Sequence, residues 1–254
     1  MRWPDGPRPT ARSTDAPRAA SARSSASTSR SGVRAVADTT FRLRVIFAKA
    51  GRLRFLSHLE VVRACERSVR RAQLAYAVTQ GFNPHMKLAF GPALPVGTAG
   101  SAESYDVWLT RFVPPDEALD RLRRSTPEGL APMEARYVPE REPSLTAALT
   151  LADYEVVVQG PGVDPDVVKA GLEAVVADGS LEIEHKGKTK VFDLAVTLPK
   201  EPTVGECSGG ATILVTTRMG ASGSLRPEAL VASALQRASV DGSVTLVTRT
   251  GLRA

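Results

Sequence analysis

The chain is poor in the residues that hold metal ions or form disulfides. Its 254 residues contain two cysteines, Cys65 and Cys207, and three histidines, His58, His85 and His185. Two cysteines cannot build a disulfide framework or a four-cysteine metal site, and so few are typical of a reducing compartment. We therefore expect a cytoplasmic protein with no metal site.

Signatures of several large functional classes are also missing. No run of about 18 apolar residues occurs, and the N-terminus lacks the apolar core of a signal peptide, so we expect no membrane span. The patterns G-x-x-x-x-G-K-[ST], G-x-G-x-x-G, C-x-x-C and H-E-x-x-H do not occur. Their absence argues against a cofactor-dependent enzyme, and we expect no cofactor.

Positive charge is distributed unevenly along the chain. Residues 39–112 hold eleven Lys and Arg against four Asp and Glu, whereas residues 113–254 hold fifteen against twenty. A basic first part indicates an anionic partner, although two domains with merely solvated charges would give the same balance. Residues 1–38 are rich in Ser, Ala, Arg, Thr and Pro, which predicts a disordered basic tail. A transit peptide, a polar extension or an arm that touches nucleic acid would have this composition.

Periodicity predicts the element order β-α-β-β-α-β in residues 39–140. Apolar residues alternate over 41–48, with Arg42 and Arg44 on the opposite face. Ser57 and Glu60 have the spacing of a capping box, which begins a helix that runs to about residue 73. Further strands are expected at 52–56, 87–90, 104–110 and 133–138, and a second helix at 114–124.

Residues 153–254 repeat this order less regularly. We expect strands at 154–159, 211–217 and 244–248, helices at 164–176 and 227–238, and a hairpin formed by 181–185 and 189–194. The Pro- and Gly-containing stretch 199–210 is expected to be irregular. The sequence thus predicts an α+β protein of two tandem βαββαβ ferredoxin-like units, joined by a linker at 141–152.

Arginines on the first predicted helix form the first candidate site. We expect the apolar stripe of this helix to consist of Leu59, Val62, Cys65, Val69 and Ala72. The opposite side carries Arg63, Arg67, Arg70 and Arg71. A guanidinium binds two phosphate oxygens at once, so this row, with Arg42 and Arg44, predicts nucleic-acid binding. The alternative is a solvated face on which Glu66 pairs with Arg70.

The loop 81–87 forms a second candidate site. Binding residues tend to collect on loops, and here Phe82, Asn83 and Lys87 are candidates for nucleic-acid binding, with Phe82 able to stack on a base. In the alternative interpretation the loop is a structural turn, and Phe82 lies in the core.

Two histidines and a glycine-rich segment complete the candidates. His58, at the start of a helix, and His85 are candidate catalytic bases, and we expect them to share one site. Alternatively they are separate capping and turn residues. Gly223, Ser224 and Arg226 precede the last helix and can cradle an anion, unless this segment is only a flexible loop.

Four segments carry a resemblance to a known family. They are RFLSHLE (54–60), QGFNPH (80–85), LPVG (94–97) and, more loosely, GSLRP (223–227). These segments resemble the radical-SAM-linked protein family, a bacterial domain of unknown function. In that family the domain is either fused behind a radical SAM module or encoded separately beside one. The chain lacks the C-x-x-x-C-x-x-C iron–sulfur ligands, so it resembles the separately encoded form.

A second resemblance concerns topology alone. Two ferredoxin-like units with an early histidine and a late Gly-rich loop are similar to the CRISPR repeat-processing endoribonucleases, which implies RNA binding. We therefore expect a non-catalytic accessory or substrate-presenting module for a separately encoded radical SAM protein, which binds RNA through its first unit. The alternatives are a metal-independent endoribonuclease that uses His58 or His85 and a purely structural adaptor.

Overall fold

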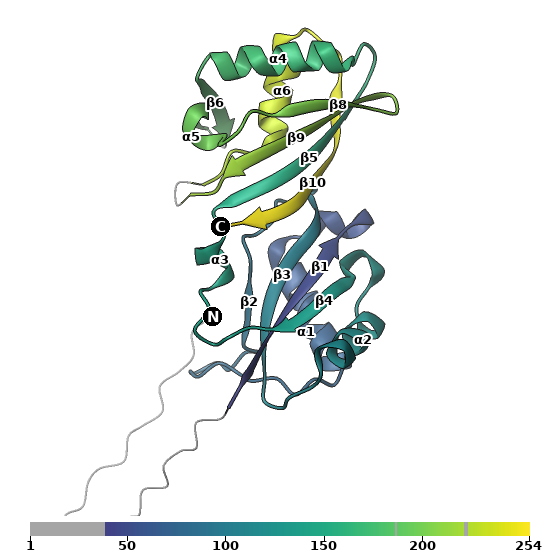
Figure 1. The fold of residues 1–254 in the computed structure, drawn as a ribbon, viewed down its shortest axis with the longest axis vertical. Coiled ribbons are helices and arrows are strands. Elements are labelled where there is room, and N and C mark those ends of the chain that lie inside the picture. Colours follow the sequence, from purple (N-terminus) through teal and green to yellow (C-terminus); the bar gives the residue numbers. More distant parts are fainter. Residues whose placement is uncertain (1–38, 186, 221–222) are drawn as a thin grey trace, which may run out of the picture. The chain divides into compact units, whose positions relative to one another are not determined.

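The described residues form one eight-stranded mixed sheet with helices packed against it, an α+β arrangement (Figure 1). The computed structural model describes residues 39–185, 187–220 and 223–254. The expected basic tail, residues 1–38, lies outside the described residues. No helix in the described part is long and apolar enough to cross a membrane.

The first half of the described chain supplies one end of the sheet. Its elements are β1 (Phe41–Lys49), η1 (Gly51–Phe55), α1 (His58–Arg71), β2 (Leu88–Phe90), β3 (Ala99–Leu109), α2 (Pro115–Ser125), η2 (Glu128–Leu130) and β4 (Pro132–Tyr137). Strand β1 pairs antiparallel with β3 and β4, and β2 pairs antiparallel with β3. The neighbour order is therefore β4-β1-β3-β2.

The second half supplies the other end and repeats this neighbour order. Its elements are α3 (Leu145–Ala148), β5 (Leu151–Gln159), α4 (Pro165–Ala177), β6 (Ser180–His185), β7 (Lys188–Asp193), α5 (Leu194–Thr197), β8 (Thr203–Cys207), β9 (Gly210–Arg218), α6 (Pro227–Arg237) and β10 (Ser243–Arg253). The strands lie in the order β10-β5-β9-β8, all antiparallel. Segment 141–152, expected to be a linker, contains α3 and the start of β5.

The two halves are joined edge to edge through β3 and β10. These strands run parallel, with Thr248 opposite Ala99 and Arg249 opposite Gly100. Strand β2 occupies the same edge of β3 only from Tyr105 to Val107, which leaves the beginning of β3 free to pair with β10. This joint positions the candidate site described below.

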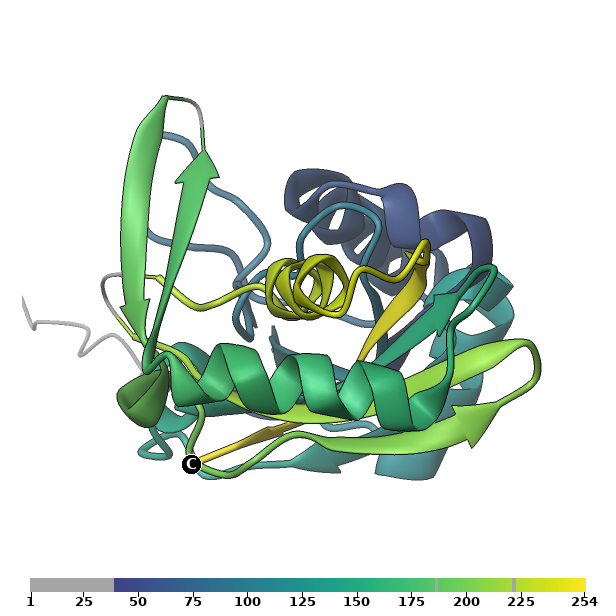
Figure 2. The same cartoon turned by 90° about the horizontal axis from the view of Figure 1, so that it is seen from above.

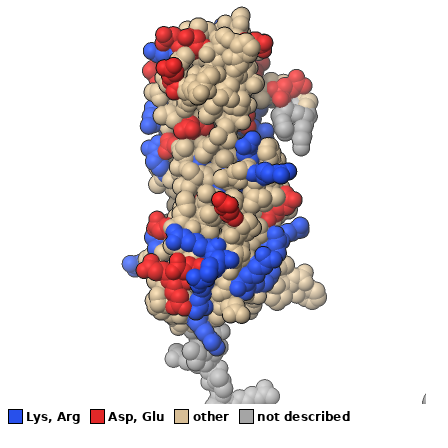
Figure 3. Space-filling view, turned by 90° about the vertical axis from the view of Figure 1, so that its right-hand side faces the viewer, with Lys and Arg blue, Asp and Glu red and all other residues tan. Residues whose placement is uncertain are grey.

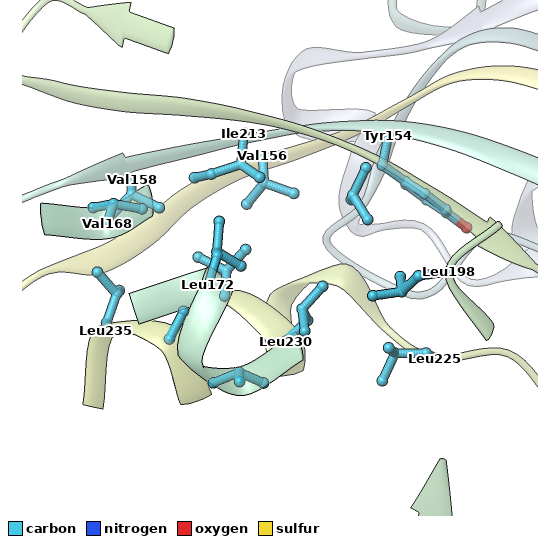
Figure 4. Packing of buried hydrophobic residues seen from close by; sticks show 14 of the residues in the cluster. Tyr154, Val156, Val158, Val168, Leu172, Leu198, Ile213, Leu225, Leu230 and Leu235 are labelled. Carbon is cyan, nitrogen blue, oxygen red and sulfur yellow. The ribbon is translucent and has the colours of Figure 1, made fainter. Parts of the chain in front are cut away.

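Each half has its own apolar core under its helices. In the first half, residues of β1 and β3 pack against α1 and α2, and the most deeply buried include Leu43, Val45, Val69, Val107 and Leu122. In the second half, α4 and α6 cover one face of β5 and β9 (Figure 2). Figure 4 shows side chains of the strands, such as Val156 and Ile213, facing Leu172 and Leu230 of these helices. Burial of these side chains is the main favourable contribution to folding.

The expected strand at 52–56 is wrong. Gly51 has φ +56, a left-handed conformation that turns the chain at the end of β1. The N–H of Leu53 then donates to Ala50 O and that of Leu56 to Leu53 O, so the backbone bonds locally and forms η1.

The expected apolar stripe of α1 is partly wrong. Leu59 is 65% exposed, whereas Val61, Ala64 and Ser68 are buried with Cys65 and Val69. Ser68 can lie inside because its hydroxyl donates to Ala64 O at 3.0 Å. The expected stripe and the observed stripe overlap, and both have the spacing of a helix face. Contact with the sheet decides which of the two is buried.

The predicted hairpin exists, but it does not belong to the main sheet. β6 and β7 pair only with each other, and Figure 2 shows them standing away from the sheet. The strand that pairs with the outer edge of β9 is β8, which comes from the stretch expected to be irregular. Gly205 weakens a strand only modestly and keeps the backbone groups needed for pairing, and at this sheet edge nothing lies within 4 Å of a Cβ added to it.

Candidate functional site

The start of α1 is fixed as its sequence predicts. The Glu60 carboxylate accepts hydrogen bonds from the backbone N–H of Ser57 at 2.8 Å and from its hydroxyl at 2.7 Å. These bonds to Ser57 lower the pKa of Glu60. This capping box sets the phase of the helix and therefore the direction in which each of its arginines points.

Four arginines of α1 are exposed on one side of the first half. Arg70 lies 3.6 Å from Glu66 and above the ring of Tyr76, as the solvated alternative predicts for this residue. Among the described residues, no acidic side chain lies within ion-pair distance of Arg63, Arg67 or Arg71. Figure 3 shows Lys and Arg gathered over the lower part of one face, where the first half lies, with Asp and Glu beside some of them.

Arg42 and Arg44 lie apart from this exposed row. Both are buried on the opposite face of β1, where they share the carboxylate of Asp106, which is 0% exposed. Arg42 Nη2 lies 2.6 Å from Asp106 Oδ2, and Arg44 Nε lies 2.8 Å from Oδ1. The hydrogen bond to Asp106 raises the pKa of Arg44 against the effect of burial. We therefore exclude both arginines from the proposed nucleic-acid surface.

The loop 81–87 exposes its aromatic side chain. Phe82 is 101% exposed, so the core position considered for it is not the one observed. Asn83 and His85 are also exposed, and the loop is held by paired bonds between Thr79 and His85. Lys87 is less available, because its Nζ lies 4.3 Å from the centre of the Trp108 ring and 3.4 Å from Glu140.

His58 lies in different surroundings from His85. Its ring meets the edge of Phe90 and lines a small cavity under the loop 91–94, together with Lys49 and Glu103. No contact between His58 and His85 is present among the described residues, and His85 belongs to the exposed loop. A shared site for the two imidazoles stays a prediction.

Ionic side chains are buried beside this cavity, at the joint between β3 and β10. Arg249 is 2% exposed and Glu103 is 6% exposed. Arg249 donates from Nε and Nη2 to the two carboxylate oxygens of Glu103, and Nη2 also donates to Pro92 O. Burial alone would lower the pKa of Arg249, but the bonds to Glu103 raise it. This pair connects the sheet joint to the loop 91–98.

Lys49 completes the buried charges. It is 2% exposed and follows a β-bulge between Phe47 and Lys49 that shifts the register of β1 against β3. Burial lowers the pKa of Lys49, and Arg249 lowers it further, while Glu103 opposes both. A buried lysine that lines a cavity is a typical candidate for a functional site.

The Gly-rich segment lies on the other side of the same loop. Ser224 and Arg226 line a pocket of about 220 Å³ with Pro92, Glu228 and Arg249. One carboxylate oxygen of Glu228 is buried there without a hydrogen-bond partner among the described residues. Gly223 has φ +95, a conformation that favours glycine. Residues 221 and 222 lie outside the described residues.

Three of the four family-like segments thus meet around the loop 91–98. The N–H of Gly97 donates to Arg54 O at 3.0 Å, His58 and Leu94 line the small cavity, and Ser224 lines the larger pocket. Sequence reasoning missed Lys49, Glu103 and Arg249, which link them. A usable signal was present: each charged residue lies two positions from a buried apolar residue of the same strand, where the inward face is expected to stay apolar.

No group of three or more His, Cys, Asp or Glu side chains in the described part of the chain is arranged to hold a metal ion. The two free thiols of the described residues differ in exposure, since Cys65 is buried and Cys207 is partly exposed. Burial raises the pKa of Cys65 to about 12, which leaves it unreactive as a nucleophile.

Comparisons with known proteins give one family and distant structural neighbours. A crystal structure of a Cbf5-Nop10-Gar1 complex has a TM-score of 0.44 at 12% identity and covers 83% of this chain, which spans 48% of that chain. An unknown protein from Galdieria sulphuraria has a TM-score of 0.25 at 15% identity, with 81% of this chain and 98% of that chain covered. No curated protein matches. Residues 42–227 match the sequence model of a family described as "Uncharacterized protein conserved in bacteria (DUF2344)", and the chain belongs to this family.

Proposed function

We propose that the chain is a non-catalytic RNA-binding module that presents RNA to a separately encoded radical SAM protein. The observation that carries the RNA-binding part is the exposed arginine row of α1, in which Arg63, Arg67 and Arg71 form no ion pair among the described residues. These arginines are spaced by four residues, so neighbouring guanidiniums lie on the same side of the helix.

Like charges at this spacing destabilise a helix, and Arg63–Arg67 and Arg67–Arg71 are two such pairs. A bound polyanion offsets this repulsion between the arginines, because each guanidinium can donate hydrogen bonds to phosphate oxygens. The surplus of basic residues in 39–112 acts in the same direction, since it raises the local concentration of anions.

Phe82 supports single-stranded RNA as the anion. An aromatic ring that is fully exposed on a loop offers a stacking surface to an unpaired base, worth roughly 1–3 kcal/mol per base. The neighbouring Asn83 adds an exposed amide for hydrogen bonds.

We further propose that the fold is two tandem ferredoxin-like units. Each half has the element order β-α-β-β-α-β if the β6–β7 hairpin and the short helices are treated as insertions. Each half also orders its strands as fourth, first, third and second along the sheet. Both features are typical of the split βαβ pattern.

Charge reversal on α1 tests the RNA-binding proposal. We expect Arg63→Glu with Arg67→Glu to weaken binding of a short single-stranded RNA, measured by fluorescence polarisation, while the far-UV circular dichroism stays unchanged. The matched control is Lys169→Glu with Lys200→Glu, which makes the same charge change at exposed positions of the second half. Equal affinities of the two variants would contradict the proposal.

Two further readouts separate the parts of the proposal. Phe82→Ala is expected to weaken binding without changing the salt dependence. The RNA is expected to be recovered intact, and cleavage that disappears in His58→Ala would contradict the non-catalytic assignment. For the partner, affinity purification from native cells is expected to recover a radical SAM protein, and its absence from stable or crosslinked complexes would remove that part.

A further inference from the structure

A pocket of about 220 Å³ lies where the loop 91–98, the segment before α6 and the joint between β3 and β10 meet. Ala93 and Arg226 line this pocket and are exposed, whereas Thr98 and Arg249 line it and are buried. The pocket therefore runs from the surface down to the joint. Its volume equals that of about seven water molecules, which suits a small ring system.

Glu228 carries the polar atom of this pocket that lacks a partner. It is the second residue of α6, where the positive end of the helix dipole favours a carboxylate. Its Oε2 is buried and accepts no hydrogen bond from the described residues. A buried acceptor without a donor is costly, because its lost hydration is not replaced. One water molecule would satisfy this oxygen but would fill only a small part of the pocket.

The charges around the pocket favour a neutral occupant. Arg249 is already paired with Glu103 through both carboxylate oxygens. Of the charged residues left, Arg226 is exposed at the mouth and Glu228 is partly buried. An anion, which the Gly-rich segment alone predicts, would face the Glu228 carboxylate, and a cation would lie near two guanidiniums. A neutral group with N–H donors satisfies Glu228 without either repulsion.

The other walls suit a flat ring that also carries an acceptor. Pro92, Pro95 and Leu225 supply apolar surface. Tyr154 lies opposite Arg249 in the pairing of β5 with β10, and it lines the same pocket. Burial raises the pKa of Tyr154 more than Arg249 lowers it, so the phenol keeps its proton and can donate a hydrogen bond.

We propose that this pocket binds an unpaired guanine base, whose N1–H and N2–H groups donate to the Glu228 carboxylate. The O6 atom beside them accepts a hydrogen bond from the hydroxyl of Tyr154 or Ser224. Adenine and cytosine present an acceptor in place of N1–H, and uracil has a single ring donor, so guanine matches this edge best. The inference rests on the proposed function, because it takes the RNA bound there as the source of the base.

The test uses guanosine as the probe and the full chain as the protein. In titrations followed by saturation-transfer NMR, we expect guanosine to bind the wild type. Inosine, which lacks the N2 amino group, is expected to bind about tenfold more weakly, and adenosine is expected to show no comparable binding. No guanosine signal in the wild-type protein, or adenosine bound as tightly as guanosine, would overturn the proposal.

Substitution of the carboxylate localises the site. Glu228→Gln keeps the side-chain shape and replaces one acceptor oxygen by an NH₂ donor, so it is expected to keep the far-UV circular dichroism and to bind guanosine at least about tenfold more weakly. The control is Glu173→Gln, which makes the same change at an exposed position of α4 and is expected to bind as the wild type does. Unchanged guanosine affinity in Glu228→Gln would overturn the assignment to this pocket.

This inference and the RNA-binding proposal can fail separately. Arg63→Glu with Arg67→Glu is expected to bind guanosine as the wild type does, because neither arginine lines the pocket. A protein that binds RNA but not guanosine would overturn this inference alone. A protein that binds guanosine but not RNA would overturn only the RNA-binding proposal.

Discussion

Replacing Asp106 by Asn should destabilise the first half strongly. The Asp106 carboxylate is fully buried and accepts four hydrogen bonds, two from Arg42 and two from Arg44. In Asp106→Asn the side chain keeps its shape, but one oxygen becomes an NH₂ donor that faces the N–H groups of a guanidinium. Arg42 then remains buried without its counter-charge, and Arg44 keeps only its ion pair with Glu142 at 2.6 Å.

The magnitude follows from the burial of the network. Removing one partner of a buried ion pair costs about 3–5 kcal/mol, because the remaining charge stays desolvated. For a domain of about 150–250 residues, this corresponds to a fall of roughly 6–20 °C in melting temperature. Arg42 also donates to the backbone oxygens of Glu142 and Pro143, so the segment that leads into α3 should loosen with the network.

Thermal and urea unfolding, followed by circular dichroism, measure this loss. The matched control is Asp153→Asn, which makes the same chemical change where the carboxylate pairs with the half-exposed Arg253. A much smaller loss is expected there, because water screens the pair. If Asp106→Asn unfolds no more easily than Asp153→Asn, burial does not govern the strength of this network and the reasoning fails.

Two further substitutions test other parts of the structure by the same unfolding measurements. Gly210→Ala should cost about 1–3 kcal/mol of stability, because the new Cβ would lie 1.9 Å from Val158 O. The control Gly205→Ala, on the adjacent edge strand, meets nothing within 4 Å and should be close to neutral. Equal effects of the two substitutions would contradict the packing of β5 against β9. Lys49→Met should stabilise the protein at neutral pH, because burial lowers the pKa of Lys49 and the folded wild type therefore binds this proton more weakly than the unfolded chain does. The stability advantage of the variant should shrink as pH rises toward about 10.4, where the unfolded chain also loses the proton. An advantage that does not change with pH would contradict this prediction.

Local structure was predictable where local signals determine it. The capping box predicted where α1 begins, and the hydrogen bonds between Ser57 and Glu60 confirm it. The alternation of apolar residues predicted β1, and the positions of the other helices followed from Pro and Asp near their first turns. The direction in which α1 faces the sheet was not predictable, because it depends on contacts with distant strands.

The buried charges were harder to predict, because their partners are far apart in sequence. Glu103 and Arg249 are separated by 146 residues, and Arg42 and Asp106 by 64. Alternation showed that Arg42 and Arg44 share a face, but it cannot tell a buried face from a solvated one. Segment 139–143 covers part of the face of β1 that carries these arginines, through Glu140 and Glu142. No local sequence pattern predicts that this distant segment packs there.

The salt dependence of RNA binding tests the central claim most directly. For single-stranded nucleic acid, the slope of log K against log salt concentration is about −0.7 for each phosphate neutralised, so contacts by Arg63, Arg67 and Arg71 predict a contribution of about −2. Removing two of them, in Arg63→Glu with Arg67→Glu, should reduce the steepness by about 1.4, whereas Lys169→Glu with Lys200→Glu should leave it unchanged. The account predicts that difference; a wild-type protein that binds no RNA, or the same slope in wild type and the α1 variant, would contradict it.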